Sequence, residues 1–261
     1  MLVLIVLTVF VATIVGSISG IGGGVLIKPV LDAVSGMPAS QISFLSGITV
    51  LTMTIVSLIR SRGGEQKISN TTIFLAIGAA VGGVAGKKVF DVIKSAAGND
   101  AMVSLIQNIV MVILTVAVFI YTLRKETVNT KNVENKAVVV TAGFILGVLS
   151  SFLGIGGGPI NLMILSYLFS MDTKTAALNS LFVIFFSQVL SLATTLVTGS
   201  VPQFDWAMLL LMMGFAVVGA TLGRTFSRRM SGKAVDVLFM VLMAVIIGLS
   251  IYNCFRYGRL V

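Results

Sequence analysis

The sequence predicts an all-α protein that crosses a membrane several times. Hydrophobic residues make up 57% of the 261 residues and charged residues only 10%, a balance that soluble domains do not have. Mean hydropathy is +1.08, and apolar runs of roughly 20 residues, enough to span a bilayer core, recur along the chain. A glycine-rich string also occurs twice. These observations predict eight hydrophobic segments in two inverted repeats of four.

The eight segments can be placed in order along the chain. They are expected at residues 2–35, 41–59, 71–90, 103–123, 137–169, 175–198, 205–223 and 234–255. The polar stretch 124–136 divides a first membrane repeat, residues 1–123, from a second, residues 137–261. The connectors are too short to fold as separate domains, so we expect the function to reside within the bilayer.

The first and fifth segments each contain the repeated string. Residues 17–24 read SISGIGGG and residues 151–158 read SFLGIGGG, so six of the eight positions are identical at an offset of 134. Glycine costs a helix about 1 kcal/mol relative to alanine, so each string is expected to break its segment. Irregular backbone at membrane depth is tolerated only where protein buries it or where it lines a cavity. A matched pair of such breaks therefore indicates a transporter binding site.

The distribution of charge favours re-entrant hairpins for segments 1 and 5. If all eight segments cross the membrane, the 18 Lys and Arg residues divide nine to nine, which the positive-inside rule does not predict. If segments 1 and 5 enter and leave on one side, the division becomes twelve to six, the second repeat is inverted and both termini lie outside. A continuous first segment would also span about 45–50 Å, too long for a core of about 30 Å. A broken helix that still crosses is the alternative.

Glycines also recur at intervals of four in the third and seventh segments. Gly78, Gly82 and Gly86 lie in the third segment, and Gly219 and Gly223 lie in the seventh. Small residues at this spacing let helices approach closely in lipid, where packing drives association. We therefore interpret these glycines as structural.

The two glycine strings are the candidate anion site. Val25 and Pro159 would begin new half-helices after the breaks, and a helix N-terminus offers free N–H groups and partial positive charge to an anion. Glycine lets a ligand approach the backbone closely. The predicted binding glycines are Gly20, Gly22, Gly23, Gly24, Gly154, Gly156, Gly157 and Gly158. A simple packing kink is the alternative role.

Charged and polar side chains near the strings are further candidates. Lys28 lies one turn into the first half-helix and could supply the counter-charge, or it could snorkel to a headgroup. Its matching position is Leu162, and the neighbouring Asn161 could donate a neutral hydrogen bond instead. Asp32 and Asp172 lie near segment ends, where they could relay protons or simply be solvated.

Polar residues in the segments after each string could complete the hydrogen-bond shell of the anion. Ser46 in the second segment matches Ser180 in the sixth at the same offset of 134, and Asn179 precedes Ser180. The alternative role of these side chains is hydrogen bonding between helices.

Enzyme chemistry is not expected. The sequence contains no histidine, so it offers no Ser-His or Cys-His nucleophile and no histidine metal ligand. The glycine strings lack the βαβ context of a dinucleotide site, so no cofactor is expected. Gly86-Lys87 lacks the glycine spacing and the Ser or Thr of a phosphate-binding nucleotide loop, so no ATP-driven motor is expected and transport would be passive or ion-coupled. The net charge of +9 is attributed to the membrane edges rather than to nucleic-acid binding.

Several of these features together resemble the TauE/SafE family of sulfite and organosulfur anion exporters. They are the two Gly-x-Gly-Gly-Gly strings, Pro29 after the first string, the eight-segment layout and the glycine-rich third and seventh segments. The resemblance covers nearly the whole chain. It implies a multi-pass permease of the cytoplasmic membrane whose substrate is a small sulfur or carboxylate anion such as sulfite, thiosulfate or sulfoacetate. The halves differ in that proline follows the second string immediately, as Pro159.

We therefore predict a permease for a small sulfur oxyanion or organosulfonate. The anion would be held between the two turns and exposed alternately as one half rocks against the other. The expected partners are the anionic substrate, the lipid bilayer and a coupling proton or ion. Two alternatives stay open, namely a carrier of another small metabolite or ion and a membrane scaffold protein that transports nothing.

Overall fold

The chain folds into a bundle of helices. Residues 2–261, which the computed structural model describes, form ten α-helices and no strand. Four helices flank the glycine strings: α1 (Leu2–Ser19), α2 (Gly24–Val34), α6 (Lys136–Leu153) and α7 (Gly158–Phe169). The others are α3 (Ala39–Ser61), α4 (Asn70–Ala97), α5 (Asp100–Arg124), α8 (Thr173–Val197), α9 (Trp206–Arg229) and α10 (Gly232–Gly258). Eight of the ten helices are long and apolar enough to cross a membrane, which confirms the predicted all-helical membrane fold.

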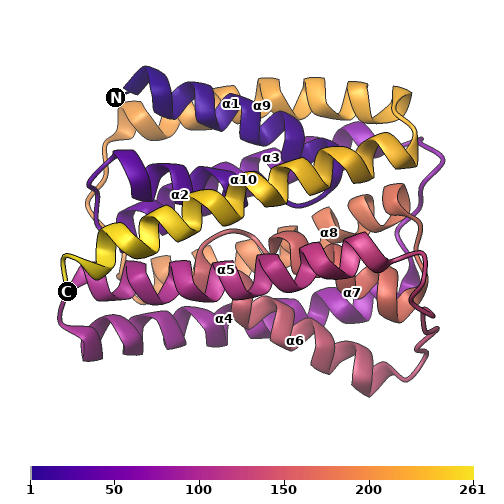
Figure 1. The fold of residues 1–261 in the computed structure, drawn as a ribbon, viewed down its shortest axis with the longest axis horizontal. Coiled ribbons are helices and arrows are strands. Elements are labelled where there is room, and N and C mark those ends of the chain that lie inside the picture. Colours follow the sequence, from indigo (N-terminus) through magenta and orange to yellow (C-terminus); the bar gives the residue numbers. More distant parts are fainter. Residues whose placement is uncertain (1) are drawn as a thin grey trace.

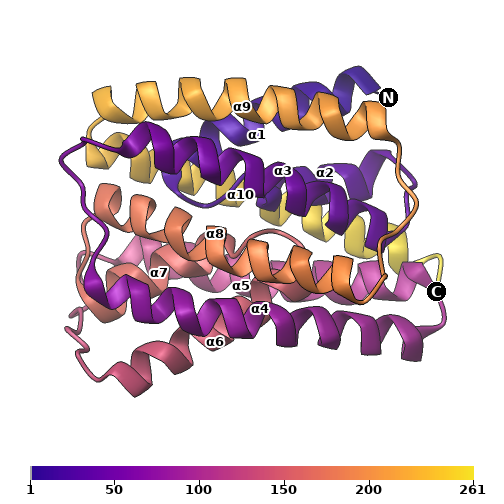
Figure 2. The same ribbon diagram turned by 180° about the vertical axis from the view of Figure 1, so that it is seen from behind.

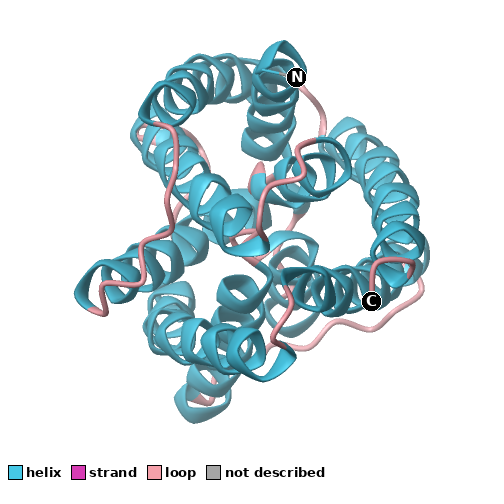
Figure 3. Ribbon diagram, turned by 90° about the vertical axis from the view of Figure 1, so that its left-hand side faces the viewer, coloured by secondary structure: helices cyan, strands magenta, loops and turns pink. Residues whose placement is uncertain are grey.

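The broken segments form hairpins at opposite ends of the bundle. Figure 1 shows α1 running inward from the end that holds both termini, and α2 returning to that end. The pair α6 and α7 is arranged in the same way at the other end, and Figure 2 shows this from behind. Figure 3 looks along the bundle and shows the helices side by side, with the loops at its ends. The glycine strings consequently lie in the interior of the bundle.

Local sequence explains where most of the helices begin. Six helices are preceded by an N-cap residue whose side chain accepts a hydrogen bond from an amide of the first turn. These capping residues are Ser69, Asn99, Asn135, Asp172, Asp205 and Ser231. In contrast, α2 and α7 start behind Gly23 and Gly157, which have no side chain to satisfy the first amides.

The end of α4 corrects one predicted boundary. We expected the third segment to end at residue 90, but the helix continues to Ala97 and stops at Gly98, whose φ of 62° is left-handed. The polar residues after position 90 extend the helix beyond its apolar part. Hydrophobicity alone therefore underestimates the length of a helix that projects past the membrane.

Close helix packing at the spaced glycines is confirmed. A Cβ atom on Gly82 would lie 2.1 Å from the carbonyl oxygen of Phe144 in α6, and one on Gly223 would lie 2.4 Å from that of Ile14 in α1. Any side chain at these positions would push the helices apart. The pairs α4–α6 and α1–α9 can therefore form only because these residues lack a Cβ atom.

Candidate anion site

Each glycine string forms a turn that other residues would adopt only with strain. Left-handed φ angles favour glycine because a Cβ atom clashes there with the backbone. In the first turn, Gly20 and Gly22 have φ angles of 77° and 85°. In the second turn the φ angles are 66° for Gly154, 82° for Gly156, 98° for Gly157 and 47° for Gly158. The chain reverses direction at both strings as a result.

The structure brings the two turns into direct contact. A Cβ atom on Gly24 would lie 2.5 Å from the carbonyl oxygen of Ile155 in the other turn. In return, a Cβ atom on Gly158 would lie 2.5 Å from the Val25 side chain. Glycine is therefore needed on both sides for the turns to approach this closely.

The turns leave several backbone donors free. Within residues 2–261, the amide N–H groups of Gly22, Gly23, Gly156 and Gly157 donate to no backbone acceptor. They precede the first turns of α2 and α7, where the helix dipole also favours negative charge. Free amides at two neighbouring helix N-termini form an arrangement that can bind an anion.

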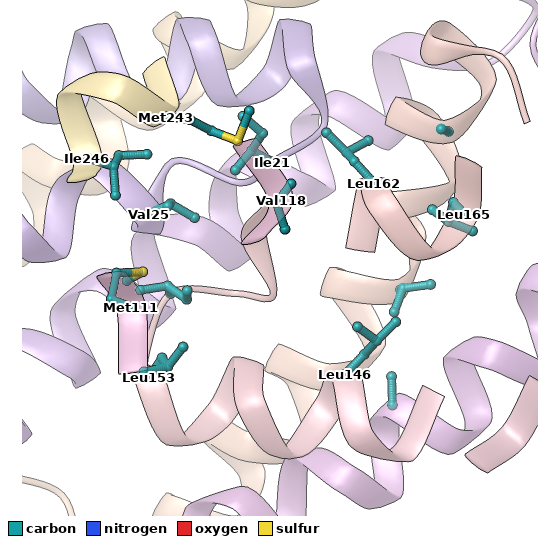
Figure 4. Packing of buried hydrophobic residues seen from close by; sticks show 14 of the residues in the cluster. Ile21, Val25, Met111, Val118, Leu146, Leu153, Leu162, Leu165, Met243 and Ile246 are labelled. Carbon is teal, nitrogen blue, oxygen red and sulfur yellow. The ribbon is translucent and has the colours of Figure 1, made fainter. Parts of the chain in front are cut away.

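One face of the crossing is closed by apolar side chains. Ile21 and Val25 are fully buried in a cluster that includes Met243 and Ile246 of α10, and Figure 4 shows these four side chains close together. A hydrated ion could not reach the turns through this layer without displacing it. Access must therefore come from the other faces, where polar residues gather.

Lys28 and Asp32 form an ion pair with each other. Both side chains are almost completely buried, at 2% and 1% exposure, and Lys28 Nζ lies 3.1 Å from Asp32 Oδ2. Asn108 donates to the same carboxylate oxygen at 3.1 Å, and Asn253 donates to the carbonyl oxygen of Pro29 at 2.8 Å. The solvated and snorkelling alternatives are therefore wrong for these two residues. The Asp32 carboxylate therefore already neutralises the Lys28 ammonium, on the face of α2 that packs against α5 and α10.

Among the other predicted residues, two support the local fold rather than a ligand. Asn179 donates to the carbonyl oxygens of Lys67 and Thr175 and accepts from the Ser69 amide, so its amide group anchors the α3–α4 connector. Ser180 donates to the carbonyl oxygen of Gly20 at 2.6 Å. The prediction that Asn179 binds the anion is corrected by these contacts because its hydrogen-bonding capacity is already used.

Ser46 and Asn161 are buried near the turns with atoms that have no partner. In the described chain, Ser46 Oγ and Asn161 Oδ1 make no hydrogen bond. Asn161 adjoins the second turn, since a Cβ atom on Gly157 would lie 2.6 Å from Asn161 Nδ2. Buried polar atoms normally have partners, so the Ser46 hydroxyl retains the capacity to donate to an anion, whereas Asn161 Oδ1 can only accept a hydrogen bond.

Asp172 lies apart from the turns, at the start of α8. It accepts hydrogen bonds from the amides of Lys174 and Thr175. Partial burial acts to raise its pKa, but these hydrogen bonds outweigh it and hold the pKa below the usual value of an aspartate. The carboxylate stays charged at neutral pH, which is poorly suited to relaying protons.

A cavity lined by both polar and apolar residues adjoins the second turn and was not predicted. Its volume is about 40 Å³, and hydroxyl, amide and ammonium groups line it beside Gly154. A single water needs roughly 10–15 Å³ on this measure, so the cavity could hold a small polyatomic anion. The polar side chains in it include Ser43, Lys87, Ser151, Gln188 and Ser191.

Hydrogen bonds organise this cavity. Ser151 Oγ and Ser191 Oγ lie 2.6 Å apart, while Ser43 Oγ has no partner in the described chain. Lys87, which lines the cavity, has its Nζ atom 2.8 Å from Asp91 Oδ1, and Asp91 does not line it. The cavity thus combines free and exchangeable donors with one cation.

The sequence did contain one signal for these residues. Ser17 and Ser57 form the same kind of pair, with their Oγ atoms 2.8 Å apart, and they precede Ser151 and Ser191 by 134 positions. Extending the repeat comparison beyond the glycine strings would have found both serine pairs. Lys87 and Gln188 have no such identical counterpart.

The chain is similar along nearly its whole length to known membrane transporters. A family model described as "Sulfite exporter TauE/SafE" matches residues 5–250. The "Probable membrane transporter protein YunE" of Bacillus subtilis (strain 168) is 24% identical over 276 aligned residues, which cover 94% of this chain and 95% of that protein. No solved structure matches.

Proposed function

Because this chain belongs to the sulfite exporter TauE/SafE family, we propose that it exports a small sulfur oxyanion or organosulfonate. The chain is a multi-pass transporter of the cell membrane. The substrate class is taken from the description of the family, and the chemistry of the candidate site supports it. Sulfite, thiosulfate and sulfonates share compact groups of oxygen atoms that accept several hydrogen bonds at once.

The observation that carries this proposal is the contact between the two glycine turns beside this cavity. Free amides precede α2 and α7. The cavity, which reaches the second turn at Gly154 but is not lined by those free amides, offers the hydroxyls of Ser151 and Ser191 and the Lys87 ammonium. Amide and hydroxyl donors with one cation match the needs of a small oxyanion. The Lys87 ammonium would also repel a cation in this cavity.

We assign the counter-charge to Lys87 rather than to Lys28. Lys28 is buried against Asp32, and separating a buried ion pair is costly. Lys87 lies at the cavity, and its partner Asp91 is 41% exposed, so solvent screens that pair. An incoming anion can therefore compete with Asp91 for Lys87 more easily than with Asp32 for Lys28.

Alternating access between inverted halves, residues 1–123 and 137–261, completes the proposed mechanism. Its support comes from contacts that recur at the 134-residue offset. The serine pairs are one example. In another, a Cβ atom on Gly156 would lie 2.7 Å from the Val50 side chain, and one on its counterpart Gly22 would lie 3.3 Å from the side chain of Ile184, the counterpart of Val50. The two hairpins also approach the centre from opposite ends, as inverted repeats would.

The test is uptake of ³⁵S-sulfite into proteoliposomes that contain the purified protein. Saturable uptake by the wild type supports the proposal, and the double variant Ser151→Ala/Ser191→Ala should raise KM at least about tenfold because two donors are lost. Thr194→Ala is the matched control, since this residue of α8 bonds only to its own helix at Leu190. Equal kinetics in the double variant and the control would contradict the proposed site.

Competition distinguishes the alternatives. Inhibition by thiosulfate and sulfonates, with little effect of carboxylates or cations, is expected for the proposed substrate class. Stronger inhibition by another metabolite would indicate that the protein is a carrier of that metabolite. A scaffold protein that transports nothing would give no saturable uptake and no thermal stabilisation by any of these anions.

A further inference from the structure

The opposite end of the bundle has a second hollow, which is lined mainly by arginines. Its volume is about 360 Å³, and it is lined by Ile59 and Arg60 of α3 and by Arg224, Thr225 and Arg228 of α9. It lies at the end where α3 and α9 finish, on the side away from both termini (Figure 1). None of the residues considered so far as binding groups belongs to it.

The central group of this hollow is a buried guanidinium without an acidic partner. Arg224 is only 5% exposed, and its Nε atom has no hydrogen-bond partner in the described chain. Its Nη1 atom donates to the carbonyl oxygen of Ser17 over a long 3.4 Å. Within residues 2–261, the ion pairs are Lys28–Asp32, Lys87–Asp91 and Lys125–Asp236, so no carboxylate neutralises Arg224.

The neighbouring charges are also positive. Arg228 is exposed and donates to the backbone carbonyl of Arg60, which fixes the two α-helix ends against each other. Burying a charge without a partner is unfavourable, and adjacent like charges add repulsion. A bound anion would remove both costs, and guanidinium groups bind oxyanions through two parallel hydrogen bonds.

The hollow is connected to the first glycine turn. Arg224 contacts Ser17, whose hydroxyl pairs with Ser57 and also lies 3.2 Å from the carbonyl oxygen of Ala220. Ser17 is the first residue of the string that leads to Gly20. An anion at Arg224 would therefore lie next to the turn on the side opposite to the cavity at Gly154.

We propose that Arg224, with Arg60 and Arg228, forms a loading site that captures the oxyanion before it reaches the glycine turns. This inference rests on the proposed function. The connectors at this end carry most of the basic residues of the chain, and the positive-inside rule places such an end in the cytoplasm. The hollow thus captures substrate on the side from which an exporter must take it, and the surrounding positive charge increases its local concentration.

The test measures ³⁵S-sulfite uptake into inverted membrane vesicles, whose outward face is the cytoplasmic one. Arg224→Gln and Thr225→Glu should each raise KM at least about tenfold, because one removes the buried cation and the other supplies a competing carboxylate. Thr225 is exposed, so Thr225→Glu tests the site even if Arg224→Gln fails to fold. Thr225→Gln, of similar size without charge, should raise KM less than threefold.

Arg229→Gln is the matched control for lost charge. Arg229 is exposed on the same helix end and does not line the hollow. The Arg229→Gln variant should therefore have the same KM for sulfite as the wild type. If Arg229→Gln and Thr225→Glu raise KM equally, general electrostatics explains the effect and the loading site is overturned. If the wild type shows no saturable uptake at all, the proposed function itself fails.

A lipid phosphate could offer the same chemistry as the free oxyanion, and reconstitution separates the two. Purified protein is placed in nanodiscs of phosphatidylcholine alone or mixed with phosphatidylglycerol, and ³⁵S-sulfite binding is measured by equilibrium dialysis. Weaker binding by Thr225→Glu in both lipids supports the loading site. If Thr225→Glu binds sulfite differently from the wild type only when phosphatidylglycerol is present, the hollow binds a lipid headgroup and the loading-site proposal is overturned.

Discussion

The two ends of the bundle each place a basic residue after a glycine with equivalent packing, at an offset of 137 rather than 134, but compensate its charge differently. Gly86 packs against Val148 and Ser151, and Gly223 packs against Ile14 and Ser17. The residue after each glycine is basic, Lys87 in α4 and Arg224 in α9. Four positions further on, Lys87 finds its ion-pair partner Asp91, whereas Arg224 finds a second cation, Arg228.

Under the proposed mechanism, this difference means that the two ends would hold an anion with unequal strength. At the end with Lys87, a carboxylate competes for the cation and favours release of the anion. At the end with Arg224, no carboxylate of the described chain competes, and capture is favoured. Such an asymmetry suits export from the basic side, and each of the following changes would break or sharpen it.

The largest effect is expected from a methyl group at the first glycine turn. In Gly20→Ala the new Cβ would lie 2.3 Å from the Ala177 backbone, whereas in Gly154→Ala it would lie 2.7 Å from Ser43 Cβ and 3.1 Å from the Ser43 backbone, so a smaller shift of α3 relieves the overlap. With the strain of a positive φ added, we expect losses of about 4 kcal/mol for Gly20→Ala and about 2 kcal/mol for Gly154→Ala. Unfolding in SDS monitored by circular dichroism measures both.

Gly248→Ala is the control for these two variants. A Cβ atom at Gly248 would meet open space, and alanine favours a helix, so no loss of stability is expected. Equal losses for Gly20→Ala and Gly154→Ala would show that backbone strain alone, rather than the difference in neighbours, determines the tolerance of the turns.

The next effect concerns the buried ion pair that only the first half contains. Lys28→Met leaves the Asp32 carboxylate buried without its ammonium and should cost about 3 kcal/mol in the free energy of unfolding. The double variant Lys28→Met/Asp32→Asn should recover most of this loss and still transport sulfite. Loss of saturable uptake in a well-folded double variant would instead show that Lys28 supplies the counter-charge for the substrate.

Sequence reasoning predicted the fold from patterns that act locally. Hydrophobic runs specify membrane helices, and the glycine strings at Gly20–Gly24 and Gly154–Gly158 specify the turns because few other residues adopt a left-handed φ. The predicted end of α4 was wrong because polar residues after position 90 can continue a helix into water. The contact between the two turns could be predicted from the repeat, because two matched glycine strings indicated a single shared site.

The candidate site was less predictable because its charges depend on partners far along the chain. Lys28 was singled out for its isolation in the sequence, but folding brings Asn108 of α5 to Asp32, and Asn253 of α10 donates in turn to Asn108. Arg224 was counted only as part of a basic connector. Its burial depends on Gly223 allowing α9 to approach α1, which no local pattern near Arg224 reveals.

A tenfold effect is expected when the basic end is given the charge pattern of the other end. Arg228→Asp places a carboxylate four residues after Arg224, as Asp91 follows Lys87, and the new pair should raise KM for sulfite in inverted vesicles about tenfold. Arg229→Asp makes the same change in net charge outside the hollow. If it weakens uptake as much as Arg228→Asp does, total charge rather than the local pair controls capture.

The smallest effect is expected from the converse change at the other end. Asp91→Asn frees Lys87 from its partly exposed partner, and since such pairs contribute about 0.2–1 kcal/mol, the affinity for sulfite at the Gly154 cavity should rise by about 1.4-fold to fivefold. Stronger retention slows release, so the maximal rate of export should fall while equilibrium binding in nanodiscs tightens. Asp100→Asn, an exposed aspartate at the start of α5 on the same side, should change neither quantity. An unchanged affinity in Asp91→Asn would mean that Lys87 does not face the anion, and the contrast in charge between the two ends would then have no bearing on transport.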